Sequence, residues 1–209
     1  MTLAELTLNA FSNKLAADSS TPGGGSAAAL AGAMSAALCG MIARLTLGRS
    51  KYEKAWPEME QVRSSAEDLM QRLLALVDKD TEAYNGVVAA LRMPKENDSQ
   101  KARRQEALEA AYKQAALVPM ETLRTVAGLV TLVERALEKG NPNCVTDAGV
   151  SAQLLRAAAV GAAYNVRINL MSIEDKDFSA KLKREAAELV AHTADSADRL
   201  GEAVELSLG

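Results

Sequence analysis

Residues 26–47 read SAAALAGAMSAALCGMIARLTL, and this run restricts the possible folds more than any other part of the chain. It contains no proline and is rich in Ala and Leu, which are strong helix formers, so it predicts one long helix. A helix that is apolar on nearly every side must be buried, in a membrane or among other helices. Arg44 lies within it and no aromatic belt brackets it. We therefore interpret it as the central helix of a bundle, whose small residues let neighbouring helices approach closely.

The rest of the chain also predicts helix. Good helix formers dominate, and breaks fall at clusters of Gly, Pro and Asn. The segment NVRINL alternates like a strand, but it continues a helical run without a break, so we favour helix there. TLAE and SIED have capping-box form, and Pro119 should kink or split the helix that contains it. The predicted helices cover about residues 3–17, 25–47, 57–93, 100–139 and 144–171, and a last one runs from SIED to the C-terminus.

These predictions together describe an all-α fold, an elongated bundle of about six helices. No internal repeat and no linker marks a boundary, so we expect a single domain over residues 1–209. At the usual rise per residue the segment 55–92 alone would span ~57 Å. Rods of that length have more side surface than a compact monomer can cover, so we expect a homodimer packed along helix faces.

Charge and composition exclude several classes of protein. With 24 Lys and Arg against 27 Asp and Glu, the net charge is -3, which argues against nucleic acid as a partner. The N-terminus lacks the pattern of a signal peptide, and we expect neither membrane insertion nor export. Cys39 and Cys144 are far apart and form no metal-binding pair. We therefore expect a cytoplasmic protein with no metal site.

Asp80 stands on a helical stripe that is otherwise mostly apolar. Its neighbours Asp78 and Glu82 lie two residues away on the wetter face, so the three acids do not form a carboxylate pair. Burial among apolar groups raises the pKa of a carboxyl toward the range useful for proton transfer. Asp80 is therefore the best acid/base candidate, although a carboxylate that only bonds a neighbouring helix end would fit the same position. The stripe comprises Leu73, Leu76, Val77, Asp80, Tyr84, Val87 and Leu91.

A second stripe, on the predicted helix 144–171, mixes polar and very small side chains. Such a face either packs tightly on another helix or lines a groove for a polar ligand, and both alternatives stay open. Asparagine carries a donor and an acceptor, which suits a ring amide or a pterin-like edge. The stripe comprises Asp147, Ser151, Ala158, Ala162, Asn165 and Asn169.

The glycines in STPGGGS, residues 20–26, open the apolar helix. They satisfy the pattern GxGxxA, but no strand precedes them, so a dinucleotide-binding site is excluded. A phosphate-binding P-loop is excluded too, because no GK[ST] follows the glycines. Free N–H groups at a helix start attract anions, and glycine allows close approach. The candidate binding residues here are Pro22, Gly23, Gly24, Gly25 and Ser26, with Arg49, Lys51 and Lys95 as possible cationic ends.

Six ordered motifs, which extend over nearly the whole chain, make the sequence resemble the cyclodeaminase family. This family is similar to the C-terminal half of the bifunctional formiminotransferase-cyclodeaminase of animals, and some bacterial members are described as methenyltetrahydrofolate cyclohydrolases. The formiminotransferase half has no counterpart in this sequence. The motifs are STPGGGSAAALAGAMSAAL, ARLTLGRSKY, LVDKDTEAYNGVVAALRMPK, ALVPMETL, KGNPNCVTDAGVSA and GAAYNVRINLMSI.

The resemblance implies an all-helical domain that dimerises and binds tetrahydrofolate near the glycine loop. It implies that Asp80, the second aspartate of DKD, is the proton donor and acceptor, in agreement with the stripe. We expect a tetrahydrofolate derivative as substrate and no bound cofactor. The remaining motif positions are expected to bind the folate, namely Tyr84, Asn141, Asp147, Asn165 and Asn169.

The expected reaction is closure of 5-formimidoyltetrahydrofolate to 5,10-methenyltetrahydrofolate with release of ammonia. The first alternative is the cyclohydrolase reaction, in which water opens 5,10-methenyltetrahydrofolate. The second is a non-catalytic folate-binding protein or a purely structural helical dimer. Both reactions pass through a tetrahedral carbon between N5 and N10, so the residues alone do not separate them.

Overall fold

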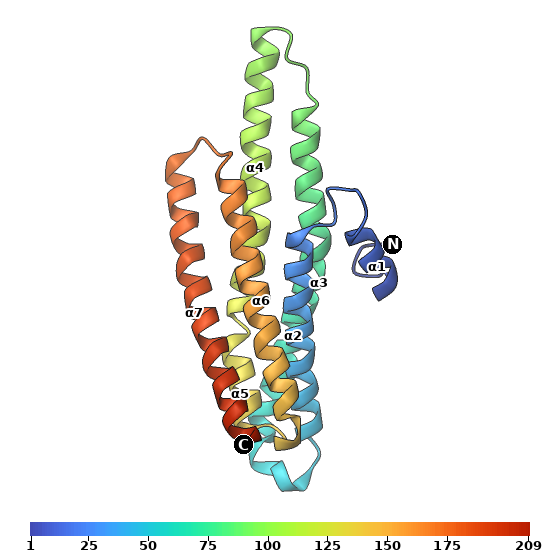
Figure 1. Cartoon of the computed structure of the whole chain (residues 1–209), viewed down its shortest axis with the longest axis vertical. Coiled ribbons are helices and arrows are strands. Elements are labelled where there is room, and N and C mark those ends of the chain that lie inside the picture. Colours follow the sequence, from blue (N-terminus) through green and yellow to red (C-terminus); the bar gives the residue numbers. More distant parts are fainter.

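The computed structural model describes all 209 residues as an elongated bundle of α-helices without strands (Figure 1). This confirms the predicted all-α fold. Two short 3₁₀ turns, Ser50–Ala55 and Pro142–Cys144, precede the third and sixth helices. The helices are α1 (Leu8–Leu15), α2 (Gly24–Thr46), α3 (Trp56–Leu91), α4 (Asp98–Ala127), α5 (Val130–Lys139), α6 (Val145–Leu170) and α7 (Lys176–Leu208).

The glycine- and alanine-rich helix α2 packs closely against α3 and α6, as its small residues predicted. A Cβ added to Gly32 would lie 3.3 Å from Leu73 of α3 and 2.8 Å from Val126 Cγ2 of α4, so a larger residue would force these side chains to move. Across the α2–α6 contact, the buried hydroxyl groups of Ser35 and Ser151 lie 3.0 Å apart and each can donate to the other's backbone carbonyl. The small stripe of α6 thus serves close helix packing over most of its length.

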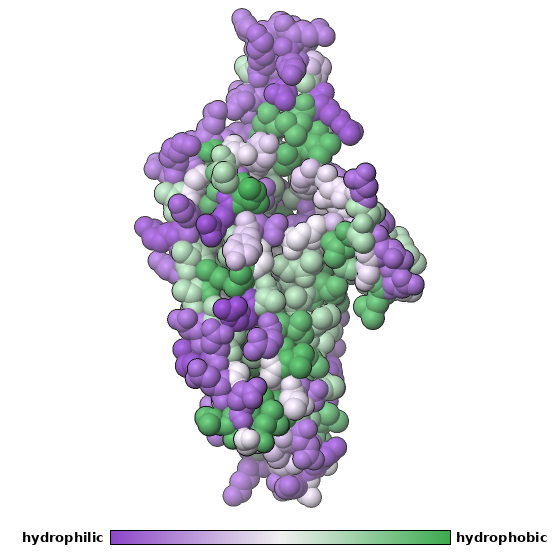
Figure 2. Space-filling view, viewed as in Figure 1, coloured by the Kyte–Doolittle hydropathy of each residue, from purple (hydrophilic) through white to green (hydrophobic).

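The hairpin of α3 and α4 extends beyond the ends of α2, α6 and α7, which leaves a step at the point where α2 begins (Figure 1). Polar residues cover the hairpin tip and the opposite end of the bundle, while white and green residues lie over much of α2 (Figure 2). The segments Gly24–Thr46 and Asp98–Lys139 are long and apolar enough to cross a membrane by length and composition alone. Most of each is buried among other helices, as in the core of a bundle.

Pro119 does not split its helix, contrary to one of the two predicted effects. The helix α4 continues through Pro119 to Ala127, and the break comes at Gly128, before α5. Proline lacks an N–H, so the carbonyl of Ala115, four residues earlier, loses its helical partner. Asn169 of α6 replaces it, because its Nδ2 donates to Ala115 O at 2.8 Å. A side chain from another helix therefore satisfies the carbonyl that the proline leaves unpaired.

Because Asn169 replaces the missing N–H of Pro119, Asn169→Ala should lose stability mainly when residue 119 is proline. Removing the amide leaves the Ala115 carbonyl unpaired, which costs about 1–3 kcal/mol in the free energy of unfolding. In a Pro119→Ala background the backbone N–H returns, so the same substitution should cost less than half as much. Urea unfolding of the four proteins gives the coupling energy, and equal losses in both backgrounds would contradict this role.

Two predicted helix starts are wrong by about one turn or more. The first helix begins at Leu8, where Thr7 Oγ1 accepts from Ala10 N, instead of near residue 3. The Glu5 carboxylate does accept from Thr2 N at 2.7 Å, as a capping box would, but only a turn forms there. The backbone N–H of Leu3 is instead held by Asp78 Oδ1 at 2.6 Å. The last helix is capped by Asp175 and not by the serine of SIED.

Candidate active site

Asp80 of α3 meets the first turn of α2 through Ser26. The backbone N–H of Ser26 donates to Asp80 Oδ2 at 2.8 Å, and its hydroxyl lies 2.9 Å from the same oxygen and 2.9 Å from Val77 O. A hydroxyl has one hydrogen, which it can give to the carboxylate or to the carbonyl. When it is given to Val77 O, a protonated Asp80 can donate to Ser26 Oγ in return. The contact thus accommodates both protonation states of the carboxyl group.

Burial raises the pKa of Asp80 above its ordinary value, and the hydrogen bonds from the Ser26 hydroxyl and N–H offset part of that rise. Desolvation penalises the charged form, whereas both donors favour it. No cation pairs with Asp80, since none of the ion pairs of the structure includes it. The carboxyl group is therefore closer than an ordinary aspartate to exchanging its proton near neutral pH.

Gly25 makes room for the carboxyl group. A Cβ at this position would overlap Asp80 Oδ1 and lie 2.6 Å from its Cγ and 2.8 Å from Oδ2. Oδ1 receives no hydrogen bond from the protein, in contrast to Oδ2. One oxygen of Asp80 is thus held by Ser26, and the other stays free for a ligand. Glycine is needed here because of the neighbouring carboxylate, which the sequence alone did not indicate.

Further polar groups lie near Asp80 and the first turn of α2. Ser26 gives its N–H to Asp80, whereas the N–H groups of Gly24 and Gly25 find no acceptor in the protein. A Cβ on Gly24 would lie 3.4 Å from Asn165 Nδ2, so α6 borders the same turn. Asn165 and Asn169 each use their Nδ2 in bonds to backbone carbonyls, which leaves both side-chain oxygens as acceptors. The structure therefore brings the glycine loop, Asp80 and Asn165 together, while Asn169 lies one turn further along α6 and bonds Ala115 O of α4.

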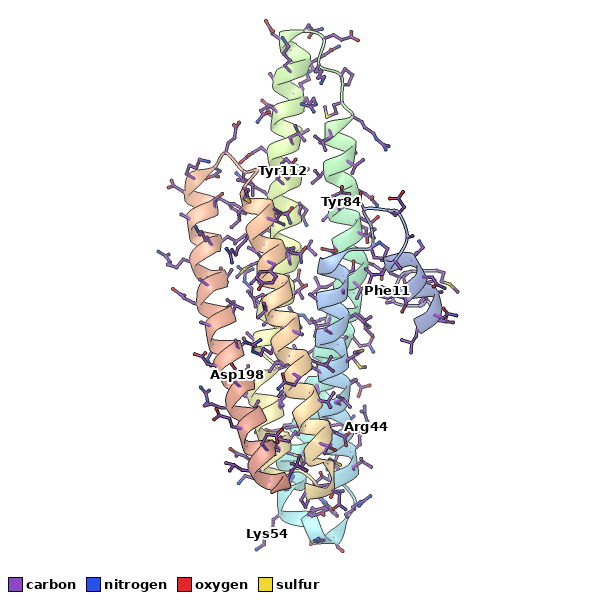
Figure 3. All side chains as sticks on the ribbon, in the orientation of Figure 1. Phe11, Arg44, Lys54, Tyr84, Tyr112 and Asp198 are labelled. Atoms are coloured by element: carbon purple, nitrogen blue, oxygen red, sulfur yellow. The ribbon has the colours of Figure 1, made fainter.

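Tyr84 lies one turn beyond Asp80 on α3, beside the start of α2, and is 41% exposed (Figure 3). Pro22 is buried and Gly23 is half-buried in the turn that leads into α2. Lys95 follows the end of α3 and is exposed near the hairpin tip. Eleven residues of helix separate Asp80 from Leu91, a rise of roughly 17 Å, so Lys95 does not contact Asp80.

Four other predicted residues lie at the far end of α2. Arg49 and Lys51 follow that end, and Asp147 stands in the first turn of α6 nearby. Asn141 is buried there and fully bonded: its N–H donates to Thr46 Oγ1 at 2.8 Å, and its Oδ1 accepts from the Tyr52 hydroxyl at 3.0 Å. Within one chain these four residues are not brought together with Asp80.

Ser26→Ala provides a test of the hydrogen bonds at Asp80. The hydroxyl favours the charged carboxylate, so its removal should raise the pKa of Asp80 further and keep the group protonated to higher pH. The carboxyl carbon shift of ¹³C-labelled aspartate, followed against pH, should show the later titration. Ser207→Ala removes an exposed hydroxyl that bonds only Ala203 O and is the matched control. A midpoint that stays or falls in Ser26→Ala would contradict the assignment.

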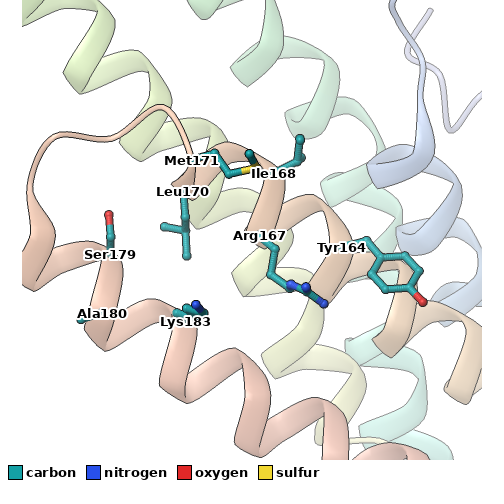
Figure 4. Close-up of a pocket in the computed structure, with 8 residues that line it drawn as sticks. All are labelled: Tyr164, Arg167, Ile168, Leu170, Met171, Ser179, Ala180 and Lys183. Atoms are coloured by element: carbon teal, nitrogen blue, oxygen red, sulfur yellow. The ribbon is translucent and has the colours of Figure 1, made fainter.

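The structure also contains a hollow of about 610 Å³ between α6 and α7, which includes none of the predicted residues (Figure 4). Its lining includes the apolar side chains of Leu170 and Met171, the cations Arg167 and Lys183, and Tyr164. No group of three or more His, Cys, Asp or Glu side chains is arranged to hold a metal ion.

The fold and the site define an all-α bundle protein with a desolvated carboxyl group beside a glycine-rich helix start. Residues 7–188 match the family model for formiminotransferase-cyclodeaminase. The chain therefore belongs to the formiminotransferase-cyclodeaminase family.

Individual relatives agree with this membership. The chain is 36% identical to a methenyltetrahydrofolate cyclohydrolase of Methylorubrum extorquens, over 95% of both chains. It is 32% identical to the formimidoyltransferase-cyclodeaminase of Rattus norvegicus over 90% of its own length, but spans only 35% of that protein. The crystal structure of formiminotetrahydrofolate cyclodeaminase from Thermotoga maritima superposes with a TM-score of 0.87 at 31% identity, with 98% of each chain covered.

Proposed function

We propose that this protein closes 5-formimidoyltetrahydrofolate to 5,10-methenyltetrahydrofolate and releases ammonia, with Asp80 as general acid and base. The observation that carries the proposal is the geometry of Asp80, whose Oδ2 is held by Ser26 while Oδ1 is free over Gly25. A tetrahydrofolate derivative as substrate is supported by the family and by the names of its relatives.

The proposed reaction needs orientation and one group that moves protons. N10 attacks the carbon of the formimidoyl group, whose nitrogen is protonated, and a tetrahedral carbon forms between N5 and N10. Asp80 takes the proton of N10 through Oδ1 and returns it to the amino nitrogen, which leaves as ammonia while the C–N bond breaks. The atoms balance, because the substrate cation becomes the methenyl cation plus ammonia. Orientation of the two nitrogens can contribute several kcal/mol, up to ~7–11 in well-aligned intramolecular cases.

The cyclohydrolase reaction is the second candidate, and a specific observation favours it. The relative that carries this name matches the chain at 36% identity over 95% of both lengths. In this reaction Asp80 would accept a proton from the water that attacks the methenyl carbon. Asp80 and a tetrahedral carbon between N5 and N10 serve both reactions. In the cyclodeaminase reaction ammonia leaves that carbon, whereas in the cyclohydrolase reaction a ring nitrogen leaves it after water has added.

The two reactions separate in one assay. Purified protein is given 5-formimidoyltetrahydrofolate, and ammonia and methenyl absorbance are followed together. A joint rise establishes the cyclodeaminase reaction. No ammonia, with loss of added methenyltetrahydrofolate faster than in buffer, establishes the cyclohydrolase reaction. Neither signal would contradict both and leave a folate-binding or structural protein.

We also propose that the enzyme works as a homodimer in the cytoplasm, without a bound cofactor and without nucleic acid or membrane as partner. Two free, buried cysteines support a reducing compartment, because neither is committed to a disulfide. Burial raises the pKa of the Cys39 thiol to about 12, so it stays an unreactive core residue.

A further inference from the structure

The hollow between α6 and α7 lies apart from the Asp80 site. Its volume of about 610 Å³ falls within the range of ~300–1,000 Å³ that is usual for small-molecule pockets (Figure 4). Arg167 of α6 lines it, two residues after Asn165, which borders the glycine loop. At about 100° per residue, side chains two positions apart point to nearly opposite sides of a helix. The hollow and the Asp80 site therefore share a stretch of α6 but use different faces of it.

Two cations without ion-pair partners line the hollow. Arg167 comes from α6 and Lys183 from α7, and neither takes part in any of the salt bridges of the structure. None of the residues that line the hollow is an Asp or a Glu. Two positive charges on one hollow, with no acid between them, attract an anion and repel a cation.

A buried hydroxyl group without a hydrogen-bond partner points to a ligand independently. Ser179, in the first turn of α7, lines the hollow, and its Oγ is buried and bonds no atom of the protein. It stands one helical turn before Lys183, so the hydroxyl and the ammonium group share a face of α7. An unpaired buried polar group costs stability and is rare in native proteins. A ligand that accepts the hydrogen of Ser179 would satisfy it.

Apolar side chains form the rest of the wall. Leu170 is nearly buried, whereas Ile168 is 60% and Met171 80% exposed beside the hollow. Large apolar side chains that gather in an exposed position mark a contact surface for another apolar group. The hollow thus combines an apolar wall with a positively charged one.

The loop that joins α6 to α7 beside the hollow is fixed to α4. Glu109 accepts from Glu174 N at 2.8 Å and from Asp175 N at 3.1 Å. Lys113 pairs with the Asp175 carboxylate at 2.7 Å. These bonds hold the loop in place without a ligand, and a site that is formed in advance loses less free energy to ordering when it binds.

We propose that this hollow is a second binding site, which takes a small molecule with an anionic head and an apolar body. The carboxylate or phosphate head binds Arg167 and Lys183 and accepts from Ser179, while the apolar body packs on Leu170 and Met171. A fatty acid and an alkyl phosphate ester share this chemistry. The site does not depend on the folate reaction proposed above.

Titration of ¹⁵N-labelled protein with octanoate tests the site. The amide shifts that move should cluster in residues 167–171 and 179–183 and saturate with a Kd of about 1 mM or tighter, which a ligand of about ten heavy atoms can reach. Acetate lacks the apolar body and octanol lacks the charge, so each should bind at least about tenfold more weakly. Octyl phosphate is the second probe, and tighter binding than octanoate would identify a phosphate ester instead of a carboxylate. No saturable shift with either probe, or shifts centred elsewhere, overturns the inference.

Variants of the two cations test the charged wall. Arg167→Gln and Lys183→Gln should each weaken octanoate binding about tenfold or more and leave octanol unaffected, because hydrogen bonds to charged groups are the strong ones. Arg184→Gln removes a neighbouring exposed cation that does not line the hollow and is the matched control. An equal loss in all three variants would show attraction by net charge alone and would contradict the site.

Two further variants separate binding from stability. Ser179→Ala removes the unpartnered hydroxyl, so it should not lower Tm, yet it should weaken octanoate several-fold. Ala180→Phe places a ring in the hollow from an exposed position of α7 and should abolish binding in a folded protein. Unchanged octanoate affinity in both variants would overturn the inference.

Competition shows whether the site is separate from that of the folate. An excess of 5-formyltetrahydrofolate should leave the Kd of octanoate unchanged, because the two sites lie on different faces of α6. Displacement of octanoate would place it at Asp80 and refute a second site. Wild type inactive in both folate assays, with octanoate bound in the hollow, would refute the proposed function and keep this site.

Discussion

Asp80→Asn is expected to lower kcat/KM by about 10²–10⁴-fold, the usual contribution of a positioned acid/base. Asparagine has nearly the same shape and can still accept the Ser26 N–H, but it cannot take up or release a proton at the free position over Gly25. The loss should appear in kcat, with the affinity for the folate little changed. Activity within a few-fold of wild type would remove Asp80 from the catalytic role.

The same variant should be at least as stable as wild type at neutral pH. Burial raises the pKa of Asp80 in the folded protein above its unfolded value. A group of this kind contributes stability below its unfolded pKa, and the contribution is lost as the pH rises through the folded pKa. At a pH above the folded pKa of Asp80, the wild-type protein carries a desolvated negative charge at this position. The neutral amide of Asp80→Asn avoids that cost. Thermal melts at neutral and acidic pH should show the advantage of Asp80→Asn shrinking toward acid, and a clear loss of Tm at neutral pH would indicate a structural role instead.

Gly25→Ala is expected to lose about 10²-fold or more of the activity, because a displacement of about 1 Å in a catalytic group can cost that much. The new methyl group would overlap Asp80 Oδ1, so either the carboxyl group turns away from Ser26 or the start of α2 shifts. Overpacking of this kind also costs about 1–3 kcal/mol in the free energy of unfolding.

The matched control is Gly86→Ala, six residues beyond Asp80 on the same helix. A Cβ there meets nothing within 4 Å, so the alanine should leave activity unchanged. It should also stabilise α3 by about 0.5–1 kcal/mol, since glycine is unfavourable inside a helix. Equal activity in both variants, measured as kcat/KM on the same folate, would contradict the close contact of Gly25 and Asp80.

The two alternatives left open for the stripe of α6 apply to different parts of the helix. Ser151 and Ala158 pack against other helices, whereas Asn165 borders the start of α2 and Asn169 bonds a carbonyl of α4. Periodicity places these residues on one face, but it does not reveal where along that face the neighbouring helix begins. Because α2 starts at Gly24, the packing contact ends there and the polar groups remain for a site.

The effect of Pro119 could not be predicted from local sequence. A proline inside a helix removes a hydrogen bond, and the usual expectation is a kink or a break. The helix continues because Asn169, which follows it by 50 positions, lies close enough to bond the freed carbonyl. Only the packing of α6 on α4 provides that partner. The helix ends instead at Gly128, a residue that is flexible by itself.

The sequence by itself determined the class of fold, the central helix and the acid/base candidate. Each follows from a local pattern in the sequence. Residues 26–47 are small and apolar, and Asp80 stands at helical spacing from the apolar residues Leu76 and Val77. The tertiary structure decided which residues meet Asp80. Ser26 and Gly25 precede it by more than 50 positions, and the crossing of α2 and α3 brings them within hydrogen-bond distance. Hydrophobic periodicity indicates which side of a helix is buried. The contacts of a site depend on where two helices cross and how far they overlap, and only tertiary packing determines this.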